Sequence, residues 1–285
     1  MLQQTTLKRL EDNVRFFCSI EPSEELAEFI QPALRSEKVV LTYDPYSEAY
    51  AELASWPLIM FGVNVSIVNS HDALYYYVPY TTEGTNYIYF TDNPEGQLGI
   101  QLESALRVMG YNRYILSWYK TKNDGVFTFS SGSDGKSVLQ GAKNVAYAFT
   151  KALYKANSNN RLTRVLNNFL VDHSELLDYI NKAISYTESC TATTIAAQGP
   201  LLSIAKLAEL LNPQINTIPI IQLLTNSKNK DVEVWGLDVD SELIARVRFE
   251  RGPFRRVIHF GLDPLSSVLV SAYAVTYAET FSILP

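Results

Sequence analysis

Several features that mark common protein classes are scarce in this sequence. Only two of its 285 residues are cysteines, Cys18 and Cys190, and they lie far apart without the spacing of a metal site. We interpret both as buried thiols rather than a disulfide. Two long stretches without charge, residues 189–205 and 264–278, fall short of the roughly 18 apolar residues of a membrane span and contain Gln, Ser or Thr. We therefore expect no disulfide framework and no transmembrane helix.

Positive charge is also in short supply. The chain has 24 basic and 30 acidic side chains, a net charge of −6, and no run of Lys and Arg long enough to form a basic stripe. This balance argues against nucleic acid and against an anionic membrane surface as the main partner. The first 13 residues mix Gln, Thr, Lys and Glu instead of the apolar core of a signal peptide, so we expect a cytoplasmic protein.

The sequence is rich in strand-to-helix junctions. Hydrophobic residues make up 47% of the chain, and its length predicts about two domains with cores of their own. Four times, an apolar run typical of a strand meets a turn with proline and then apolar side chains at helical spacing. The strands are predicted at residues 39–42, 87–91, 193–197 and 257–260, and the prolines are Pro45, Pro94, Pro200 and Pro264.

Each proline stands where we expect the first helical residue, a position that tolerates its missing N–H. Asp44, Asn93 and Asp263 precede three of these prolines and are expected to cap the helices. Repeated β-α units predict the α/β class, with parallel strands covered by helices on both faces. Further strands are predicted at residues 65–68, 114–118, 126–130, 232–237 and 243–247.

A polar stretch at residues 156–160 marks the expected domain boundary. We predict an N-terminal helical segment at residues 1–35, a first domain at 36–156, and a linking helix with a second, shorter domain at 161–285. The linking helix carries a long apolar stripe from Leu162 to Ile180 that offers a surface for another domain or subunit. His173 lies on this stripe, and we interpret it as a half-buried histidine without a ligand role.

The order and spacing of these segments resemble the double sugar-isomerase (SIS) domain family of phosphosugar isomerases. Residues 39–50 are similar to the family's opening strand and Gly-Ser-Gly-Thr-Ser-Tyr turn, residues 89–96 stand at its Ser-Gln-Ser-Gly-Glu-Thr motif, and residues 204–209 resemble its Ala-Leu-Lys-Leu-Lys-Glu helix. The resemblance implies two flavodoxin-like, doubly wound SIS subdomains, each a three-layer α/β/α unit with a five-stranded parallel sheet. It also implies a homodimer and a sugar-phosphate ligand, with no cofactor or metal.

The family holds its phosphate with hydroxyls and with N–H groups at helix starts, which stabilise a dianion. Open α/β sheets bind ligands at these same strand ends. The resemblance names one set of candidates for phosphate or sugar binding: Ser47, Thr91, Asn93, Gly96 and Gln198.

The two candidate turns also depart from the family pattern. Tyr43 and Pro45 replace the two glycines of the first turn, and Asp44 and Asp92 add a carboxylate to each turn. A carboxylate about 4 Å from a phosphate costs about 1 kcal/mol in water and several times more at low dielectric constant. If Asp44 and Asn93 cap their helices instead, the turns are structural and the anion site is degraded.

Aldose-ketose isomerisation moves a proton between adjacent carbons through an enediol and therefore needs a base. The resemblance assigns this base to Glu209, whose apolar neighbours would raise its pKa if it faces a pocket; the alternative is a solvated helix glutamate. The family's histidine is absent near residues 217–219, and its C-terminal lysine is absent because no Lys follows Lys230. His259, near a strand end, is the candidate replacement acid, and His71 from a second subunit is the weaker candidate.

A Gly-Lys-Ser sequence ends the loop at residues 131–137 and is similar to the end of a nucleotide-binding P-loop. The first glycine of that motif is replaced by Ser130, so a turn with Ser137 at a helix start is the favoured interpretation.

Two hypotheses remain open. The first is a phosphosugar-binding protein that isomerises its ligand through an enediol, with Glu209 as base. The second is a catalytically degenerate SIS-fold sugar-phosphate sensor or binding protein that has lost its acid groups. A complete amidotransferase is not expected, since only some 35 residues precede the first strand.

Overall fold

The computed structural model describes residues 2–123, 125–156, 159–184, 192–225, 231–251 and 254–281. The chain forms two compact units, which we call the first unit (residues 21–133 and 140–167) and the second unit (residues 1–20, 134–139 and 168–285). The boundary expected at residues 156–160 includes two residues outside the described part and stays a prediction. Cys18 is half-buried, and Cys190 lies outside the described residues.

The first unit contains a five-stranded parallel sheet in the order β2-β1-β3-β4-β5. This is the flavodoxin-like order, and it confirms the predicted α/β class. Every residue of the central strand β3 is buried, as expected for a sheet covered on both faces. The strands are β1 (Lys38–Tyr43), β2 (Val65–Asn69), β3 (Thr85–Thr91), β4 (Asn112–Ser117) and β5 (Val126–Thr128).

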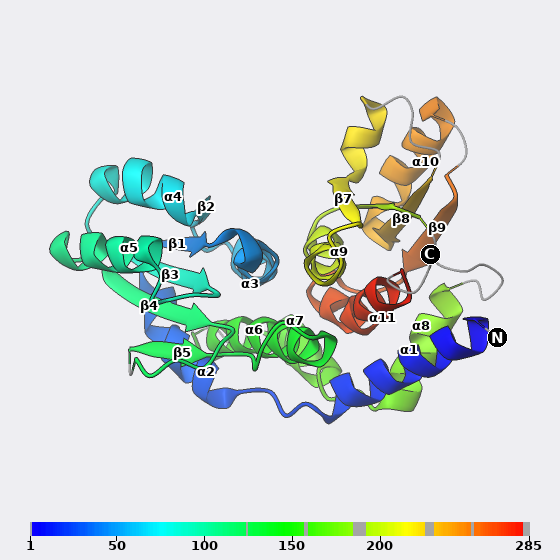
Figure 1. The fold of residues 1–285 in the computed structure, drawn as a ribbon, viewed down its shortest axis with the longest axis horizontal. Coiled ribbons are helices and arrows are strands. Elements are labelled where there is room, and N and C mark those ends of the chain that lie inside the picture. Colours follow the sequence, from blue (N-terminus) through cyan, green and yellow to red (C-terminus); the bar gives the residue numbers. More distant parts are fainter. Residues whose placement is uncertain are drawn as a thin grey trace. The chain divides into compact units, whose positions relative to one another are not determined.

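Helices cover both faces of this sheet. Figure 1 shows α5 (Gln97–Val108) on one side and α6 (Gly135–Ala156) on the other. A Cβ built at Gly141 of α6 would lie 3.0 Å from the Tyr50 ring of α3 (Glu48–Met60), so α3 and α6 share a face. The remaining α-helices of the first unit are α2 (Glu24–Ile30), the short α4 (Ser70–Asp72) and α7 (Asn160–Asn168).

The second unit contains a four-stranded parallel sheet in the order β7-β6-β8-β9. The family resemblance implied five strands, and the described residues of this unit form four. The strands are β6 (Thr194–Ala197), β7 (Asn216–Pro219), β8 (Val232–Leu237) and β9 (Arg256–Phe260). The α-helices are α1 (Leu2–Ser19), α8 (His173–Ala183), α9 (Pro200–Leu211), α10 (Ser241–Arg251) and α11 (Ser271–Phe281). None of the described helices is both long and apolar enough to cross a bilayer.

One strand prediction was wrong and one strand was missed. Residues 243–247, predicted as a strand, lie inside α10, where Ile244 and Val247 are buried together against the sheet. Their three-residue separation puts them on one face of a helix, and a short apolar run does not distinguish this pattern from a buried strand. The missed strand is β7, an edge strand with little apolar character that ends in Pro219.

The long apolar stripe is carried by two helices rather than one. Asp172 ends the intervening turn and caps α8, because its Oδ1 accepts hydrogen bonds from the N–H groups of Ser174 (2.8 Å) and Glu175 (3.1 Å). The buried apolar side chains of the stripe are Leu162, Val165, Phe169, Leu176 and Ile180, whereas Leu170, in the turn between the two helices, is 71% exposed.

The proline junctions differ from the prediction at three of four sites. Pro45 and Pro264 open 3₁₀ turns, η2 (Pro45–Ser47) and η7 (Pro264–Val270), which precede α3 and α11. Pro94 lies three residues ahead of α5, whose N-cap is Gly96. Asp263 caps its turn as expected through the N–H of Leu265, whereas the side chains of Asp44 and Asn93 cap nothing.

Candidate functional site

The carboxyl ends of β1 and β3 flank the point where the strand order of the first sheet reverses. Open α/β sheets bind their ligands in the crevice at this switch point. Asp44 directly follows β1, and Thr91 and Asp92 end or follow β3. We therefore take these strand ends as the candidate site of the first unit.

The carboxylate of Asp44 is the centre of this site. Its Oδ1 accepts a hydrogen bond from Ser70 Oγ at 2.7 Å, and its Oδ2 accepts one from Thr91 Oγ1 at 2.5 Å. The Tyr89 hydroxyl lies 2.8 Å from both carboxylate oxygens. Asp44 is only 9% exposed, and a carboxylate this buried is stable because such hydrogen bonds replace its lost water. Three hydroxyls at the strand ends are thus engaged by an anion that belongs to the chain.

Ser47 and Thr91 lie at the site as the sequence predicted, but both are buried and already bonded within the chain. Ser47 Oγ accepts a hydrogen bond from Trp118 Nε1 at 2.9 Å, and the Ser47 N–H donates to the Asp44 carbonyl at 2.7 Å. Thr91 Oγ1 donates to Asp44 and also accepts from the Asn93 N–H at 3.0 Å. The Thr91 proton is therefore committed to Asp44, and Ser47, which accepts in its bond with Trp118, is fully buried.

Asn93 and Gly96 form the exposed turn that enters α5. The Gly96 N–H donates to the Asn93 carbonyl at 3.0 Å. A Cβ built at Gly96 would lie only 3.1 Å from the Asn93 carbonyl oxygen and amide nitrogen, so the close approach of this turn explains the glycine.

The second carboxylate of the site, Asp92, is half-buried. Burial raises its pKa above the ordinary value, and the nearby charge of Asp44 adds to this effect. Burial and the same Asp44 charge also raise the pKa of Tyr89, so its hydroxyl keeps the proton that it donates. The strand ends therefore present negative charge where a phosphate was expected.

The remaining predicted residues belong to the second unit. Glu209 is half-buried near the end of α9, and the Thr217 hydroxyl of β7 donates a hydrogen bond to its Oε2. Gln198 follows β6, and its buried Oε1 has no hydrogen-bond partner among the described residues. His259 of β9 is exposed and borders a hollow with Asp238 and Arg248. No hydrogen bond or ion pair in the described part of the chain joins these three predicted residues to one another.

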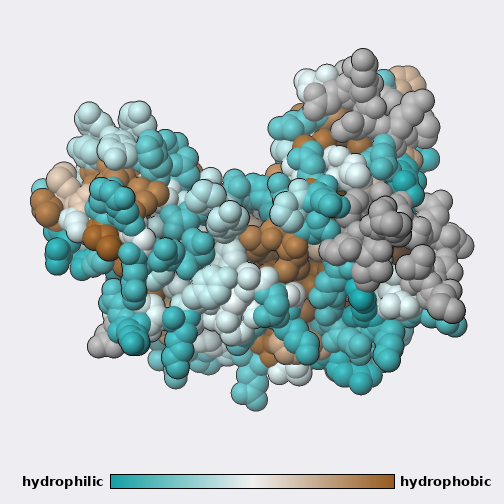
Figure 2. Space-filling model, in the orientation of Figure 1, coloured by the Kyte–Doolittle hydropathy of each residue, from teal (hydrophilic) through white to brown (hydrophobic). Residues whose placement is uncertain are grey.

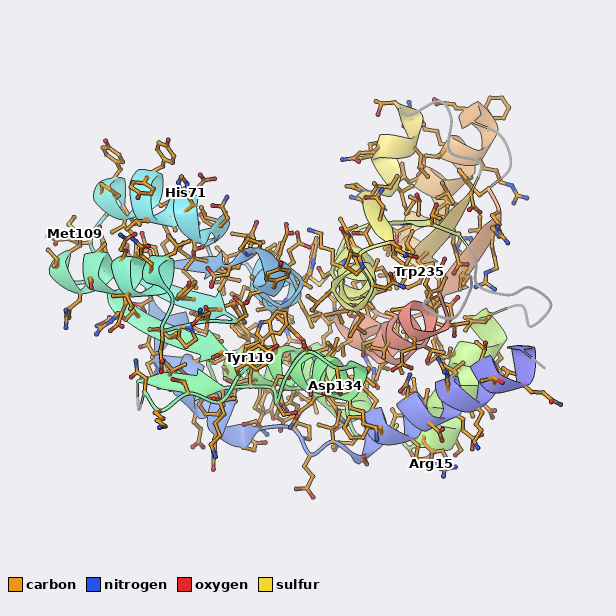
Figure 3. The ribbon with its side chains drawn as sticks, viewed as in Figure 1. Arg15, His71, Met109, Tyr119, Asp134 and Trp235 are labelled. Carbon is orange, nitrogen blue, oxygen red and sulfur yellow. The ribbon has the colours of Figure 1, made fainter. Side chains whose placement is uncertain are left out.

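His71, the weaker candidate acid, lies on α4 in the first unit (Figure 3). Its exposed ring packs against Tyr75 with 4.8 Å between ring centroids, and its Nδ1 lies 3.7 Å from Asp72 Oδ1. These contacts are with its neighbours in sequence and do not involve Asp44.

The Gly-Lys-Ser loop is a helix cap. Asp134, at the start of α6 in Figure 3, accepts hydrogen bonds from the N–H groups of Lys136 (3.0 Å) and Ser137 (3.2 Å). It also accepts one from the Ser137 hydroxyl at 2.7 Å, and this bond is the main reason that its pKa lies below the ordinary value. Lys136 Nζ lies over the Phe16 ring, 5.4 Å from its centroid. The N–H groups that a phosphate needs are therefore already occupied, as in the turn that the sequence favoured.

Sequence reasoning named Thr91 but missed Ser70 and Tyr89 as partners of Asp44, and Trp118 as the partner of Ser47. Tyr89 and Thr91 have an (i, i+2) spacing that puts both side chains on one face of β3, and this pattern was the available signal. Ser70 and Trp118 follow different strands, β2 and β4, so only the topology brings them to the site.

A separate hollow of about 550 Å³ lies in the first unit, lined almost entirely by apolar side chains of α5 and the turns before β3. Figure 2 shows hydrophobic residues gathered over these elements, and Met109 is labelled there in Figure 3. Within the described ranges, no three His, Cys, Asp or Glu side chains gather in a way that could hold a metal ion.

No family model matches the sequence, and no curated protein matches it. Several solved structures share its fold. A putative phosphosugar isomerase from Silicibacter pomeroyi is 12% identical with a TM-score of 0.66, covering 99% of this chain and 95% of that one. The C-terminal domain of glucosamine-fructose-6-phosphate aminotransferase from Francisella tularensis is 11% identical, with a TM-score of 0.63 and coverage of 99% and 96%. Tagatose-6-phosphate ketose/aldose isomerase from Escherichia coli is 13% identical, with a TM-score of 0.60 and coverage of 99% and 92%.

These similarities confirm, at the level of the fold, the resemblance to the sugar-isomerase family. The chain has two parallel sheets, each flanked by helices, and it shares its fold with these solved structures along almost its whole length.

Proposed function

We propose that this protein is a catalytically degenerate member of the sugar-isomerase fold, which binds a ligand without isomerising it. The observation that carries the proposal is the position of the Asp44 carboxylate. It engages the hydroxyls of Ser70, Tyr89 and Thr91 at the strand ends where related folds are expected to hold a phosphate.

The energetics support this view. Hydrogen bonds to a charged group contribute about 1.5–3 kcal/mol each, and a phosphate at these strand ends displaces Asp44 from three donors. If Asp44 stays in place, two negative charges about 4 Å apart repel by roughly 4 kcal/mol near a protein surface. The repulsion weakens phosphate binding by about three powers of ten, and on the first route the bonds that the phosphate gains only replace those that Asp44 loses.

Isomerisation through an enediol, with Glu209 as base and His259 as acid, is the alternative raised by the sequence. It needs a carboxylate that is free to remove a proton from carbon, and the hydrogen bond from Thr217 already engages Glu209. The histidine that the family resemblance implies near residues 217–219 is missing as well. These observations favour the degenerate protein over the isomerase.

The test is an assay for interconversion of fructose 6-phosphate with glucose 6-phosphate, and of glucosamine 6-phosphate with fructose 6-phosphate and ammonia. We expect the same background rate for the unmodified protein, for Glu209→Gln and for the exposed control Glu242→Gln on α10. Turnover that disappears in Glu209→Gln and persists in Glu242→Gln would establish the isomerase instead.

The same proposal includes a cytoplasmic homodimer. The family resemblance supports a dimer, although most of the stripe first considered for its interface is buried within the chain and only Leu170 of its large side chains is strongly exposed. Light scattering of the purified protein decides the point, since a dimer has twice the chain mass of 32.1 kDa.

A further inference from the structure

A hollow in the second unit lies at the carboxyl ends of β8 and β9, away from the Asp44 site. Asp238 directly follows β8, and His259 is the fourth residue of β9. One face of α10 forms the opposite wall. The hollow has a volume of about 740 Å³, and its lining includes Asp238, Ser241, Ile244, Arg248, Val257 and His259. Ligands of open α/β sheets bind at this end of the strands.

Several charged or polar side chains at this hollow have no hydrogen-bond or ion-pair partner in the described part of the chain, although Ser241 donates to the Asp238 carbonyl at 2.7 Å. Among the described residues, none forms a hydrogen bond or ion pair with the Asp238 carboxylate, the Arg248 guanidinium or the His259 ring. The Tyr179 hydroxyl, contributed by α8, is buried and also has no hydrogen-bond partner in that part of the chain. The strand ends of the first unit differ, because the hydroxyls of Ser47, Ser70 and Thr91 are engaged by Trp118 or Asp44.

The backbone at Gly261 leaves room for a ligand atom between two of these groups. A Cβ built at Gly261 would lie 3.5 Å from Asp238 Oδ2 and 3.7 Å from the Tyr179 hydroxyl oxygen. A ligand hydroxyl near this point can donate to the carboxylate and accept from the phenol. Burial and the charge of Asp238 raise the pKa of Tyr179 to about 12, so the phenol keeps its proton at neutral pH.

The other side chains of the hollow indicate two further features of a ligand, an anionic group and an apolar face. Arg248 and His259 suit an anionic group, and a guanidinium binds carboxylate or phosphate through paired hydrogen bonds. Ile244, Ala245 and Val257 give the lining an apolar part that can contact the carbon face of a sugar ring.

We propose that this hollow is a binding site for a hydroxylated small molecule with one anionic group, of the sugar-acid or sugar-phosphate class. Asp238 and Tyr179 hold a ligand hydroxyl at Gly261, and Arg248 holds the anion. The site goes beyond the function proposed above and shares no residue with the Asp44 cluster.

The test is isothermal titration of the full chain with glucuronate, glucose 6-phosphate and glucose. The two anionic sugars are expected to bind. The Kd of glucose is expected to be at least about tenfold higher, because glucose lacks the charged group that Arg248 recognises. Comparison of glucuronate with glucose 6-phosphate distinguishes a carboxylate from a phosphate as the preferred anion.

Three variants locate the site. Gly261→Ala fills the space beside Asp238 and Tyr179 with a methyl group at ordinary contact distance, in a backbone conformation that needs no glycine. We expect it to raise the Kd of the anionic sugars about tenfold or more, and Asp238→Asn to do the same. Arg248→Gln is expected to abolish the preference for the anionic sugars over glucose.

The matched control is Arg246→Gln. Arg246 lies on α10 shortly before Arg248, is exposed and forms an ion pair with Glu250. This variant should leave every Kd unchanged. Absence of binding by all three sugars overturns the proposal, as does binding that Gly261→Ala and Asp238→Asn do not weaken. Binding lost only in Asp44→Asn assigns the ligand to the first unit and also overturns it. Failure of the proposed function has a different signature, which is phosphosugar turnover.

Discussion

Replacement of Asp44 by alanine is expected to destabilise the protein and to create an anion site in the same step. The substitution removes the acceptor of three hydroxyls, those of Ser70, Tyr89 and Thr91. All three side chains are buried. Hydrogen bonds to a charged group contribute about 1.5–3 kcal/mol each, and water entering the vacated space recovers part of this. We therefore expect a loss of about 3–5 kcal/mol in the free energy of unfolding.

The assay is urea unfolding at neutral pH, with and without inorganic phosphate. Phosphate stabilises whichever protein binds it by RT ln(1 + [L]/Kd), about 2.7 kcal/mol at a hundred times Kd. The Asp44→Ala variant should gain stability with phosphate, because the anion takes the place of the carboxylate beside the three hydroxyls. The unmodified protein should gain none at this site.

The control is Asp44→Asn, which keeps the shape of the side chain and removes its charge. It should lose less stability than Asp44→Ala, since its carbonyl oxygen still accepts hydrogen bonds, and it should gain little from phosphate. The reasoning fails if Asp44→Ala unfolds at the same urea concentration as the unmodified protein, or if phosphate stabilises both proteins equally.

Three further predictions concern other charged groups. The pKa of Asp92 is raised in the folded protein, so the free energy of unfolding falls as pH rises from the unfolded-state pKa to the folded-state pKa. Asp92→Asn should therefore have a higher Tm than the unmodified protein at pH 7. A lower Tm would contradict this. Asp134→Ala should lower the free energy of unfolding by about 1 kcal/mol at pH 7, because it removes the cap of α6. The loss should be smaller in acid. Hydrogen bonds from Ser137 lower the pKa of Asp134, and their stabilisation disappears as that carboxylate is protonated. Equal losses at both pH values would refute it. Glu233→Gln should lower the free energy of unfolding in urea by about 3–5 kcal/mol, because it removes the buried carboxylate that lies 2.9 Å from the Arg256 guanidinium, whose side chain is 8% exposed. A loss under 1 kcal/mol would contradict that view.

Much of the fold was predictable from the sequence because the strand-to-helix junctions repeat with clear periodicity. The apolar runs that became β1, β3, β6 and β9 are flanked by turn residues, and their helices show regular apolar spacing. The prediction failed where periodicity was ambiguous. Leu243–Val247 is too short to distinguish a strand from one face of α10, and the polar edge strand β7 carries almost no apolar signal.

The candidate site was only partly predictable. The positions of Ser47 and Thr91 at the strand ends followed from the α/β pattern and the family resemblance, and the structure places both there. The role of Asp44 did not follow, because a residue before proline at a helix start is most often a cap. Its three partners come from β3 and from the end of β2, and contacts between separate strands depend on the tertiary structure. The hollow beside Asp238 was missed for the same reason.

The central claim is that an internal carboxylate has replaced the phosphate at the strand ends of the first unit. A crystal structure of the protein grown with fructose 6-phosphate in large excess tests it most directly. The account predicts the Asp44 carboxylate within hydrogen-bond distance of Ser70, Tyr89 and Thr91, with no phosphate at the ends of β1 and β3. A phosphate bound by Ser47 and Thr91, with Asp44 turned away, would contradict it.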